Sequence, residues 1–323
     1  MKRKALAITL AAVMAMGTCA VTASAADGDK YTIGICQLVQ HDALDAATQG
    51  FKDEVIKELG EDAVTFDEQN AQGDSNTCST IVNSFVSNNV DLILANATPA
   101  LQAAAAGTSD IPILGTSVTE YGVALGLDDF DGTVGGNISG TADLAPLDEQ
   151  AAMLQELFPD AKNVGLLYCS AEANSQYQID VIKEELEKLN YTCTAYSFVD
   201  SNDIASVVQS AVNENDVLYV PTDNTAASNT EVINNIAGEA GVPIIAGEAG
   251  ICKGCGVATL SISYYDLGYQ TGKMAYEILV NGADPSTMEV EFAPAVTKQY
   301  NPDICEKLGI TVPDDYEALD MSE

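Results

Sequence analysis

The stretch GICQLVQHDALDAATQG, residues 34–50, contains the only histidine of the 323-residue chain, His41. A histidine after an apolar run can act as a general base, bind a metal ion or form part of a pocket wall. A metal site needs further ligands, and a general base needs a residue that orients it. Only Asp42 and Asp45 are nearby, and either has the simpler role of capping the helix that begins near Leu44. We therefore predict that His41 is a pocket wall or rim residue, and we predict no metal site.

Few other residues are suited to catalysis. Arg3 is the only arginine, and the chain contains no G-x-S-x-G, G-x-G-x-x-G or G-x-x-x-x-G-K-[ST] motif. With a single histidine and no arginine beyond the predicted signal, acid–base and phosphoryl-transfer chemistry have few candidate residues. The sequence therefore predicts a protein that is not an enzyme and needs no cofactor.

Cysteines suggest a second kind of chemistry. Cys252 and Cys255 form a Cys-x-x-Cys pair in a glycine-rich loop, with no second pair or histidine nearby. A structural zinc site needs four ligands, so a local disulfide and two thiols are the main alternatives. Cys36 and Cys169, at predicted strand ends, are expected in the core.

The first residues are typical of an export signal. Three basic residues at positions 2–4 precede an apolar run over 5–16 and small residues at 23–26. This pattern predicts a signal peptide over residues 1–26, cleaved after Ala25 or Ala26. Lipidation of Cys19 is the alternative, although Met16 and Thr18 suit a lipobox poorly. No other segment approaches the ~20 apolar residues of a membrane span, so we expect an exported protein, periplasmic or at the cell surface.

The charge balance limits the partners. Beyond the predicted signal, 10 lysines stand against 48 acidic residues. Nucleic acid and anionic membrane surfaces bind clustered positive charge, so neither is an expected partner. A ligand carboxylate would have to be held without arginine, by helix N-termini, hydroxyl groups or a lysine.

Apolar runs and helical segments alternate along the chain, as in parallel sheets covered on both faces. Strands are predicted at 31–36, 64–66, 91–95, 111–114, 164–168, 192–198, 217–220 and 243–246. The glycine-rich passage 132–140 divides them into two successive α/β units, and later segments return to complete both. We predict two doubly wound parallel-sheet lobes with several crossings between them: lobe I, residues 29–142 plus 261–288, and lobe II, residues 143–260 plus 289–318.

Short polar loops follow the predicted strands of both units. Ligands of doubly wound sheets bind beyond the carboxyl ends of the strands. Ser, Thr, Asn and Asp at these places are also ordinary helix caps, but their occurrence in both units favours a pocket between the lobes.

Several motifs together resemble the substrate-binding proteins of ABC transporters, in the family typified by tryptophan and tyrosine binders. They are IGICQLVQHDALDAATQGF, EQNAQGD, ATPALQ, NISGTAD, NSQYQ, VPTDNT and DLGYQTGKMAYEIL. The resemblance implies a type I periplasmic-binding-protein fold with a three-strand hinge, closure over one ligand, and ABC permease subunits as membrane partners. It also implies an amino-acid ligand, aromatic or otherwise apolar, and we expect a monomer. The acidic, cysteine-bearing loop GEAGICKGCG departs from the family pattern and is expected to tune specificity.

An amino-acid zwitterion needs donors for its carboxylate and an acid for its ammonium group. We assign the carboxylate to Thr98, Ser117 and Thr119, and the ammonium to Asp223, with Glu248 as second choice. His41 or Tyr168 would stack on the side chain. The predicted ligand-binding residues are Leu38, His41, Leu44, Asp45, Thr98, Pro99, Ser117, Val118, Thr119, Tyr168, Asn174, Ser175, Asp223, Asn224 and Glu248.

Two further functions suit the same fold. One is a sensor that reports a ligand to a membrane signalling protein. The other is a nucleoside or sugar binder, which the absence of tryptophan disfavours.

Overall fold

A computed structural model describes residues 30–293 and 295–322. The predicted signal peptide, residues 1–26, and Cys19 lie outside the described residues. Within those ranges, no helix has both the length and the apolar character needed to span a membrane.

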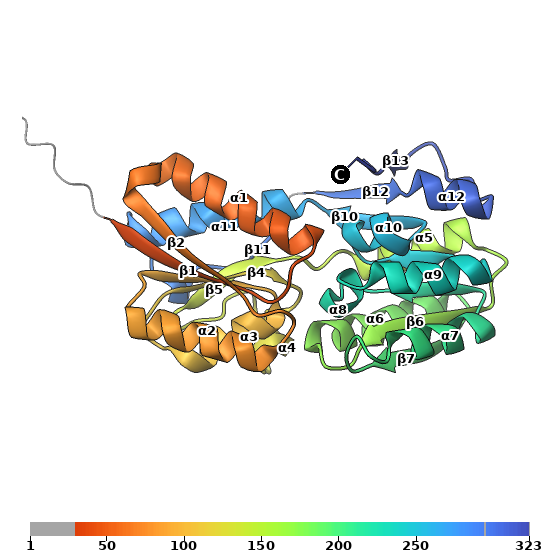
Figure 1. Ribbon diagram of the computed structural model, residues 1–323, viewed down its shortest axis with the longest axis horizontal. Coiled ribbons are helices and arrows are strands. Elements are labelled where there is room, and N and C mark those ends of the chain that lie inside the picture. Colours follow the sequence, from red (N-terminus) through yellow and green to blue (C-terminus); the bar gives the residue numbers. More distant parts are fainter. Residues whose placement is uncertain (1–29, 294, 323) are drawn as a thin grey trace, which may run out of the picture.

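The first sheet has six parallel strands in the order β11-β5-β4-β3-β1-β2 (Figure 1). Its strands are β1 (Tyr31–Gln37), β2 (Val64–Asn70), β3 (Leu92–Asn96), β4 (Ile113–Val118), β5 (Ile138–Ala142) and β11 (Glu291–Phe292). One face is covered by α1 (Asp42–Leu59) and α11 (Tyr264–Leu279). The other is covered by α2 (Ser75–Asn88), α3 (Thr98–Gly107) and α4 (Tyr121–Leu125). This sheet and its helices form lobe I.

The second sheet has seven strands in the order β13-β12-β10-β9-β8-β6-β7. They are β6 (Asn163–Cys169), β7 (Thr192–Phe198), β8 (Val217–Val220), β9 (Ile244–Ala246), β10 (Ala258–Ile262), β12 (Val296–Tyr300) and β13 (Glu317–Ala318). One face carries α5 (Leu147–Leu157), α6 (Ala173–Lys188) and α12 (Pro302–Leu308). The other carries α7 (Ile204–Glu214), α8 (Asn224–Ala227), α9 (Thr230–Ala240) and α10 (Ala249–Cys255). These elements form lobe II; two short 3-10 turns, η1 (Glu61–Ala63) and η2 (Pro285–Thr287), complete the assignment.

Both lobes use the same strand order, β2-β1-β3-β4-β5 in lobe I and β7-β6-β8-β9-β10 in lobe II. The order reverses beside β1 and beside β6, where doubly wound sheets open a crevice at their carboxyl ends. The predicted fold class, two doubly wound α/β lobes, is confirmed. Figure 1 shows the lobes side by side along the long axis of the molecule.

The chain passes between the two sheets three times, from β5 to α5, from β10 to α11 and from β11 to β12. The predicted lobe boundary needs one correction. Glu291 and Phe292 were expected in lobe II, but they pair with Thr141 and Ala142 of β5. A strand of two exposed residues has no alternation from which its partner could be predicted.

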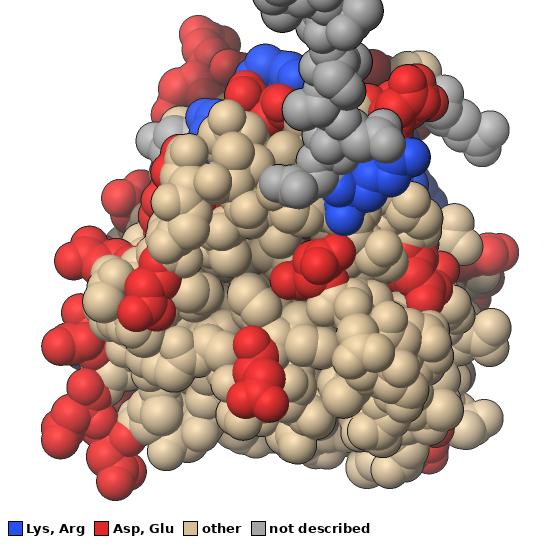
Figure 2. Space-filling model, turned by 90° about the vertical axis from the view of Figure 1, so that its left-hand side faces the viewer, with Lys and Arg blue, Asp and Glu red and all other residues tan. Residues whose placement is uncertain are grey.

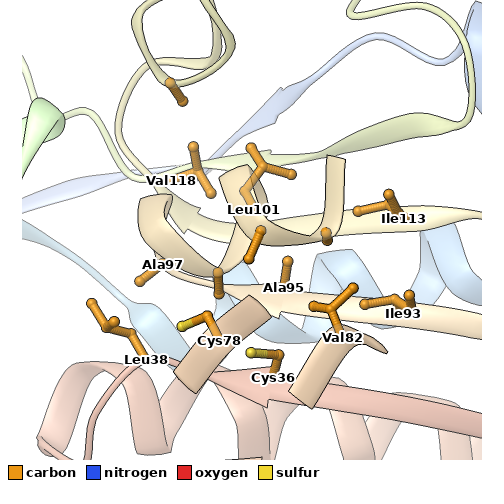
Figure 3. Close-up of a cluster of buried hydrophobic side chains, with 14 of the residues drawn as sticks. Cys36, Leu38, Cys78, Val82, Ile93, Ala95, Ala97, Leu101, Ile113 and Val118 are labelled. Atoms are coloured by element: carbon orange, nitrogen blue, oxygen red, sulfur yellow. The ribbon is translucent and has the colours of Figure 1, made fainter. Parts of the chain in front are cut away.

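Seven cysteines lie in the described part of the chain, and all of them are free. Cys252 and Cys255 are buried in the core of lobe II. Cys36 and Cys78 lie in the lobe I core together with Val82 and Ala95 (Figure 3). The cysteines therefore pack as small apolar side chains.

Two glycines bring the backbones of α1 and α11 into contact. A Cβ atom on Gly268 would lie 1.9 Å from the carbonyl oxygen of Ala47, and one on Gly50 would lie 2.1 Å from that of Tyr265. Real Cβ atoms do not approach so closely, so both positions require glycine. Because α1 begins beside His41 and α11 begins at the second crossing, this packing fixes the hinge against the first loop of lobe I.

We predict that Gly268→Ala lowers the free energy of unfolding by about 1–3 kcal/mol, because the added methyl group overpacks a backbone contact. Gly238→Ala is the matched control. Its added Cβ would meet mainly the flexible end of Lys307, 2.8 Å away, and alanine is favoured over glycine inside a helix by about 0.5–1 kcal/mol. Urea unfolding of both variants measures the difference. Equal stability of the two variants would contradict the packing argument.

Candidate functional site

A small cavity lies between the lobes at the carboxyl ends of their strands. Its walls come from the α1 start and the ends of β4 and β5, from the ends of β8 and β9, and from the first turns of α6, α8 and α11. The lining residues are His41, Ala43, Leu44, Ser117, Thr119, Asp143, Asn174, Thr222, Asp223, Asn224, Ala227, Glu248 and Tyr264. The space between them is about 10 Å³, roughly what one water molecule needs. The two lobes are therefore closed onto each other.

Four buried polar atoms in this lining have no hydrogen-bond partner within the described part of the chain. They are His41 Nδ1, Ser117 Oγ, Asp143 Oδ1 and Asn174 Oδ1. A buried polar atom without a partner costs about 1–3 kcal/mol. Their gathering around one cavity marks it as the place where a polar ligand would be held.

Asp143 follows β5 at the first crossing and is 3% exposed. Its Oδ2 accepts a hydrogen bond of 2.8 Å from the Tyr264 hydroxyl, and its Oδ1 has no partner. Burial raises the pKa of the Asp143 carboxyl group, and the nearby hydroxyl groups of Tyr264 and Thr119 only partly oppose this shift. A positive group at Oδ1 would offset this desolvation and favour the ionised form.

Asp223 also reaches the cavity, but both of its oxygens are engaged by the backbone. Oδ2 accepts from the N–H of Cys169 at 2.6 Å, and Oδ1 caps α8 by accepting from the N–H of Ala226 at 2.8 Å. Burial, with a smaller contribution from the charge of Glu172, raises the pKa of Asp223 to about 7. The residue predicted to bind an ammonium group therefore has a structural role in joining α8 to β6.

Two more carboxylates are satisfied in the same way. Glu172 accepts from the backbone and side-chain N–H groups of Asn224 and from the backbone N–H and hydroxyl of Thr225. Glu248 caps α10 by accepting from the N–H groups of Gly250 and Ile251. Burial raises the pKa of Glu248 to about 7.

No lysine or arginine is among the residues that line the cavity. Asp143, Asp223 and Glu248 line it, and Glu172 bonds Asn224 directly behind it. Acidic side chains also outnumber basic ones on the outer end of lobe I (Figure 2). Within the described ranges, no three His, Cys, Asp or Glu side chains are arranged to hold a metal ion. The cavity thus concentrates acidic groups, and no basic side chain in its lining balances them.

His41 joins the lobes directly, because its Nε2 lies 3.2 Å from Oδ1 of Asn224. The Asn224 amide donates through Nδ2 to Glu172 at 2.6 Å, so Oδ1 must accept and His41 Nε2 must carry the proton. Burial lowers the pKa of His41, which favours the neutral ring. In that tautomer Nδ1 is an acceptor.

Asn174 presents a second acceptor by the same reasoning. Its Nδ2 lies 3.2 Å from the carbonyl oxygen of Thr222 and donates to it, so its unpartnered Oδ1 is the carbonyl oxygen. The cavity therefore offers three acceptors, His41 Nδ1, Asn174 Oδ1 and Asp143 Oδ1, together with the hydroxyl of Ser117.

The sequence-predicted residues divide into two sets. Those that line the cavity are His41, Leu44, Ser117, Thr119, Asn174, Asp223, Asn224 and Glu248. Those that do not are Leu38, Asp45, Thr98, Pro99, Val118, Tyr168 and Ser175.

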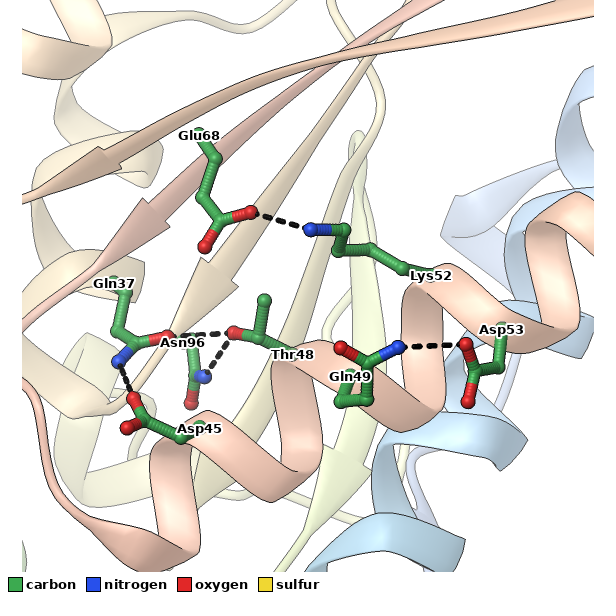
Figure 4. Close-up of polar contacts among 8 residues, drawn as sticks. All are labelled: Gln37, Asp45, Thr48, Gln49, Lys52, Asp53, Glu68 and Asn96. Carbon is green, nitrogen blue, oxygen red and sulfur yellow. Dashed lines mark hydrogen bonds and ion pairs between the residues drawn. The ribbon is translucent and has the colours of Figure 1, made fainter. Parts of the chain in front are cut away.

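Three of the second set need a correction. Val118 packs in the lobe I core near Leu101 (Figure 3), and Tyr168 packs in the lobe II core, so neither forms the cavity wall. Both side chains point to a face of their sheet that helices cover. Asp45 accepts a hydrogen bond of 2.6 Å from Gln37, in a polar chain that continues through Thr48 to Asn96 (Figure 4).

Sequence reasoning missed other members of the lining, chiefly Asp143 and Tyr264. Both stand at crossings between the lobes, directly after β5 and near the end of β10. Asp143 closes the motif NISGTAD, so its place after a strand was the available signal.

Three comparisons with known proteins bear on this site. A family model described as ABC transporter substrate-binding protein matches residues 32–320. A tyrosine-binding protein of Clostridioides difficile (strain R20291) is 40% identical over 253 residues, which are 76% of this chain and 72% of the relative.

Two solved structures resemble the fold. An ABC domain from Streptococcus pneumonia in complex with L-Trp superposes with a TM-score of 0.85 at 32% identity, over 88% of this chain and 97% of that one. The ligand-free, open structure of a substrate-binding protein with adhesive properties from Clostridium difficile gives 0.69 at 38% identity, over 90% and 100%. The open structure superposes less well although it is the more identical of the two, in agreement with the closed arrangement of the lobes here.

The raised pKa of Glu248 gives a testable pH dependence. The folded chain retains a proton that the unfolded chain releases between the ordinary value of 4.5 and about 7. This contribution to stability is therefore fully present below about pH 4.5 and is lost as the pH rises to about 7. We predict that the urea midpoint falls less over this range in Glu248→Gln than in the unaltered protein.

The exposed Glu61→Gln serves as the control, and its midpoint should fall as much as that of the unaltered protein. A fall in Glu248→Gln that matches this control would contradict the assignment.

Proposed function

The chain belongs to the family of ABC transporter substrate-binding proteins, and from this premise we propose that it is the extracytoplasmic binding subunit of an ABC importer for an aromatic amino acid. In this proposal residues 1–26 direct export, and permease subunits in the membrane receive the closed, loaded form. The chain has no G-x-x-x-x-G-K-[ST] motif, so ATP hydrolysis belongs to another subunit.

One observation carries the amino-acid assignment. Three buried acceptors without partners, on His41, Asn174 and Asp143, line one small cavity. A primary ammonium group has three N–H donors and one positive charge. It would satisfy all three acceptors and place a cation beside the one carboxylate oxygen of the lining that has no donor. The three N–H donors match the three acceptors, and the positive charge matches the carboxylate. This match favours an α-ammonium group over the hydroxyl groups of a sugar.

Hydroxyl groups of the cavity would donate hydrogen bonds to the carboxylate of the ligand. Ser117 lines the cavity with an unpartnered hydroxyl, and its backbone has the unusual φ of 53°. A residue with a side chain in this left-handed region is strained, and such strain is concentrated at functional sites. Ser117 and its neighbour Thr119 are therefore the proposed carboxylate donors. Thr98 is buried outside the lining, so in this proposal it does not bind the carboxylate directly.

The names of the relatives support an aromatic side chain. The curated relative is a tyrosine-binding protein, and a similar domain was solved with L-Trp. Among the lining residues, Tyr264 and His41 have rings.

Closure follows from the charges. Each lobe supplies acids and acceptors to the cavity, so the closed state concentrates negative charge unless a cation is present. An ammonium ligand interacts with both lobes only when they are closed, and it therefore shifts the population toward that state. The His41–Asn224 hydrogen bond then joins the lobes directly.

We predict that Asp143→Asn weakens L-tyrosine binding at least about 30-fold in calorimetry. Removing the charge from a buried pair costs about 2–5 kcal/mol, and each 1.4 kcal/mol is tenfold. The asparagine keeps the shape and still accepts from Tyr264. The exposed Asp148→Asn is the matched control and should bind as the unaltered protein does.

Binding by Asp143→Asn within twofold of the unaltered protein would overturn the ammonium site. Absence of binding of L-tyrosine, L-tryptophan and L-phenylalanine by the unaltered protein would overturn the proposed function itself.

A further inference from the structure

The cavity that would hold the ammonium group has no room for a ring. Its space of about 10 Å³ corresponds to roughly one water molecule, and a phenol or indole ring is many times larger. If the chain binds an aromatic amino acid, the ring must occupy another space that is continuous with the cavity.

A larger groove lies beside the cavity, between the same two lobes. Its volume is about 420 Å³, within the range of small-molecule sites. Lobe I contributes Leu38, Val39 and Pro99 to its walls, and lobe II contributes Ala171 and Val199. We call this space the side groove.

The side groove and the cavity share a wall. Asn224 lines both of them, and His41 follows Val39 on the same loop. The contact of 3.2 Å between His41 Nε2 and Asn224 Oδ1 therefore lies between the two spaces. His41 precedes α1 without making a side-chain cap, so no cap restrains its imidazole from turning.

The walls of the side groove suit an uncharged, flat group. Apolar side chains from both lobes form part of its walls, beside polar ones such as Gln72 and Ser201, and Val199 is 60% exposed. A ring between them would cover apolar surface that is otherwise in contact with water.

Charge excludes an anionic occupant. Asp74, Glu172 and Asp200 line the side groove, and its lining residues include no lysine or arginine. A peptide that extended into it would bring its terminal carboxylate next to these acids. A neutral ring meets no such repulsion.

We propose that the side groove holds the aromatic side chain of the ligand, and that the His41–Asn224 contact opens to admit the ring and forms again beside it. This inference rests on the proposed function, in which the ammonium group occupies the cavity. The ring then lies between Leu38, Val39 and Pro99 of lobe I and Ala171 and Val199 of lobe II. Specificity for the side chain depends on these walls, and recognition of the α-ammonium depends on the cavity.

The test fills the side groove from its exposed side. In Val199→Trp the indole takes the place of the ligand ring, and we expect calorimetry to give affinities for L-tyrosine and L-tryptophan at least tenfold weaker. Val280→Trp is the matched control, because Val280 is also exposed, at 44%, and lies in lobe I at the end of α11. This control should bind within twofold of the unaltered protein.

A second measurement needs no variant. The chain contains no tryptophan, so the emission of bound L-tryptophan can be recorded without a tryptophan background from the protein. We expect a shift to shorter wavelength on binding, because the ring leaves water for apolar walls.

The outcomes separate the two proposals. If the unaltered protein binds none of the aromatic amino acids, the proposed function fails. If it binds them and Val199→Trp, shown to be folded by circular dichroism, binds as tightly as the control, the side groove is not the ring site.

Discussion

Closing the two lobes gathers buried carboxylates around a cavity that has no lysine or arginine in its lining, and the surrounding structure is arranged to tolerate that charge. Glu172, Asp223 and Glu248 each receive backbone N–H donors from the first turn of a neighbouring helix. These hydrogen bonds satisfy free N–H groups at the helix N-termini and also stabilise the buried carboxylates. Asp143 alone keeps an oxygen without a donor. The acid that remains unbalanced therefore lies where a ligand can reach it.

The hinge brings that acid into place. Asp143 begins the first crossing, Tyr264 begins the helix after the second, and the bond of 2.8 Å between them joins the two crossings. Gly50 and Gly268 hold α11 against α1, the helix that begins beside His41. A ligand that contacts both Asp143 and His41 therefore affects the position of the segments that cross between the lobes. This arrangement couples binding to the relative position of the lobes.

Much of the architecture could be predicted from sequence, because strand ends carry polar loops and buried strands carry apolar runs. The lobes, the family and the residues after β4, β8 and β9 followed from this pattern. The places of Tyr168 and Val118 did not, because the pattern does not show which side chains near a strand end pack in the core. Asp143 and Tyr264 were missed because their meeting depends on how the crossings fold back. The role of Asp223 depended on hydrogen bonds to Cys169 and Ala226, which no sequence pattern specifies.

In this proposal the positive charge of the ligand offsets the acids and holds the lobes closed. The most direct test compares L-tyrosine with 3-(4-hydroxyphenyl)propanoate, which has the same ring and carboxylate but no amine, by thermal unfolding at neutral pH. A ligand present at a hundred times its Kd stabilises the folded chain by about 2.7 kcal/mol. We predict that L-tyrosine raises the melting temperature and that the deaminated analogue at equal concentration leaves it unchanged. An equal rise with both compounds would contradict it.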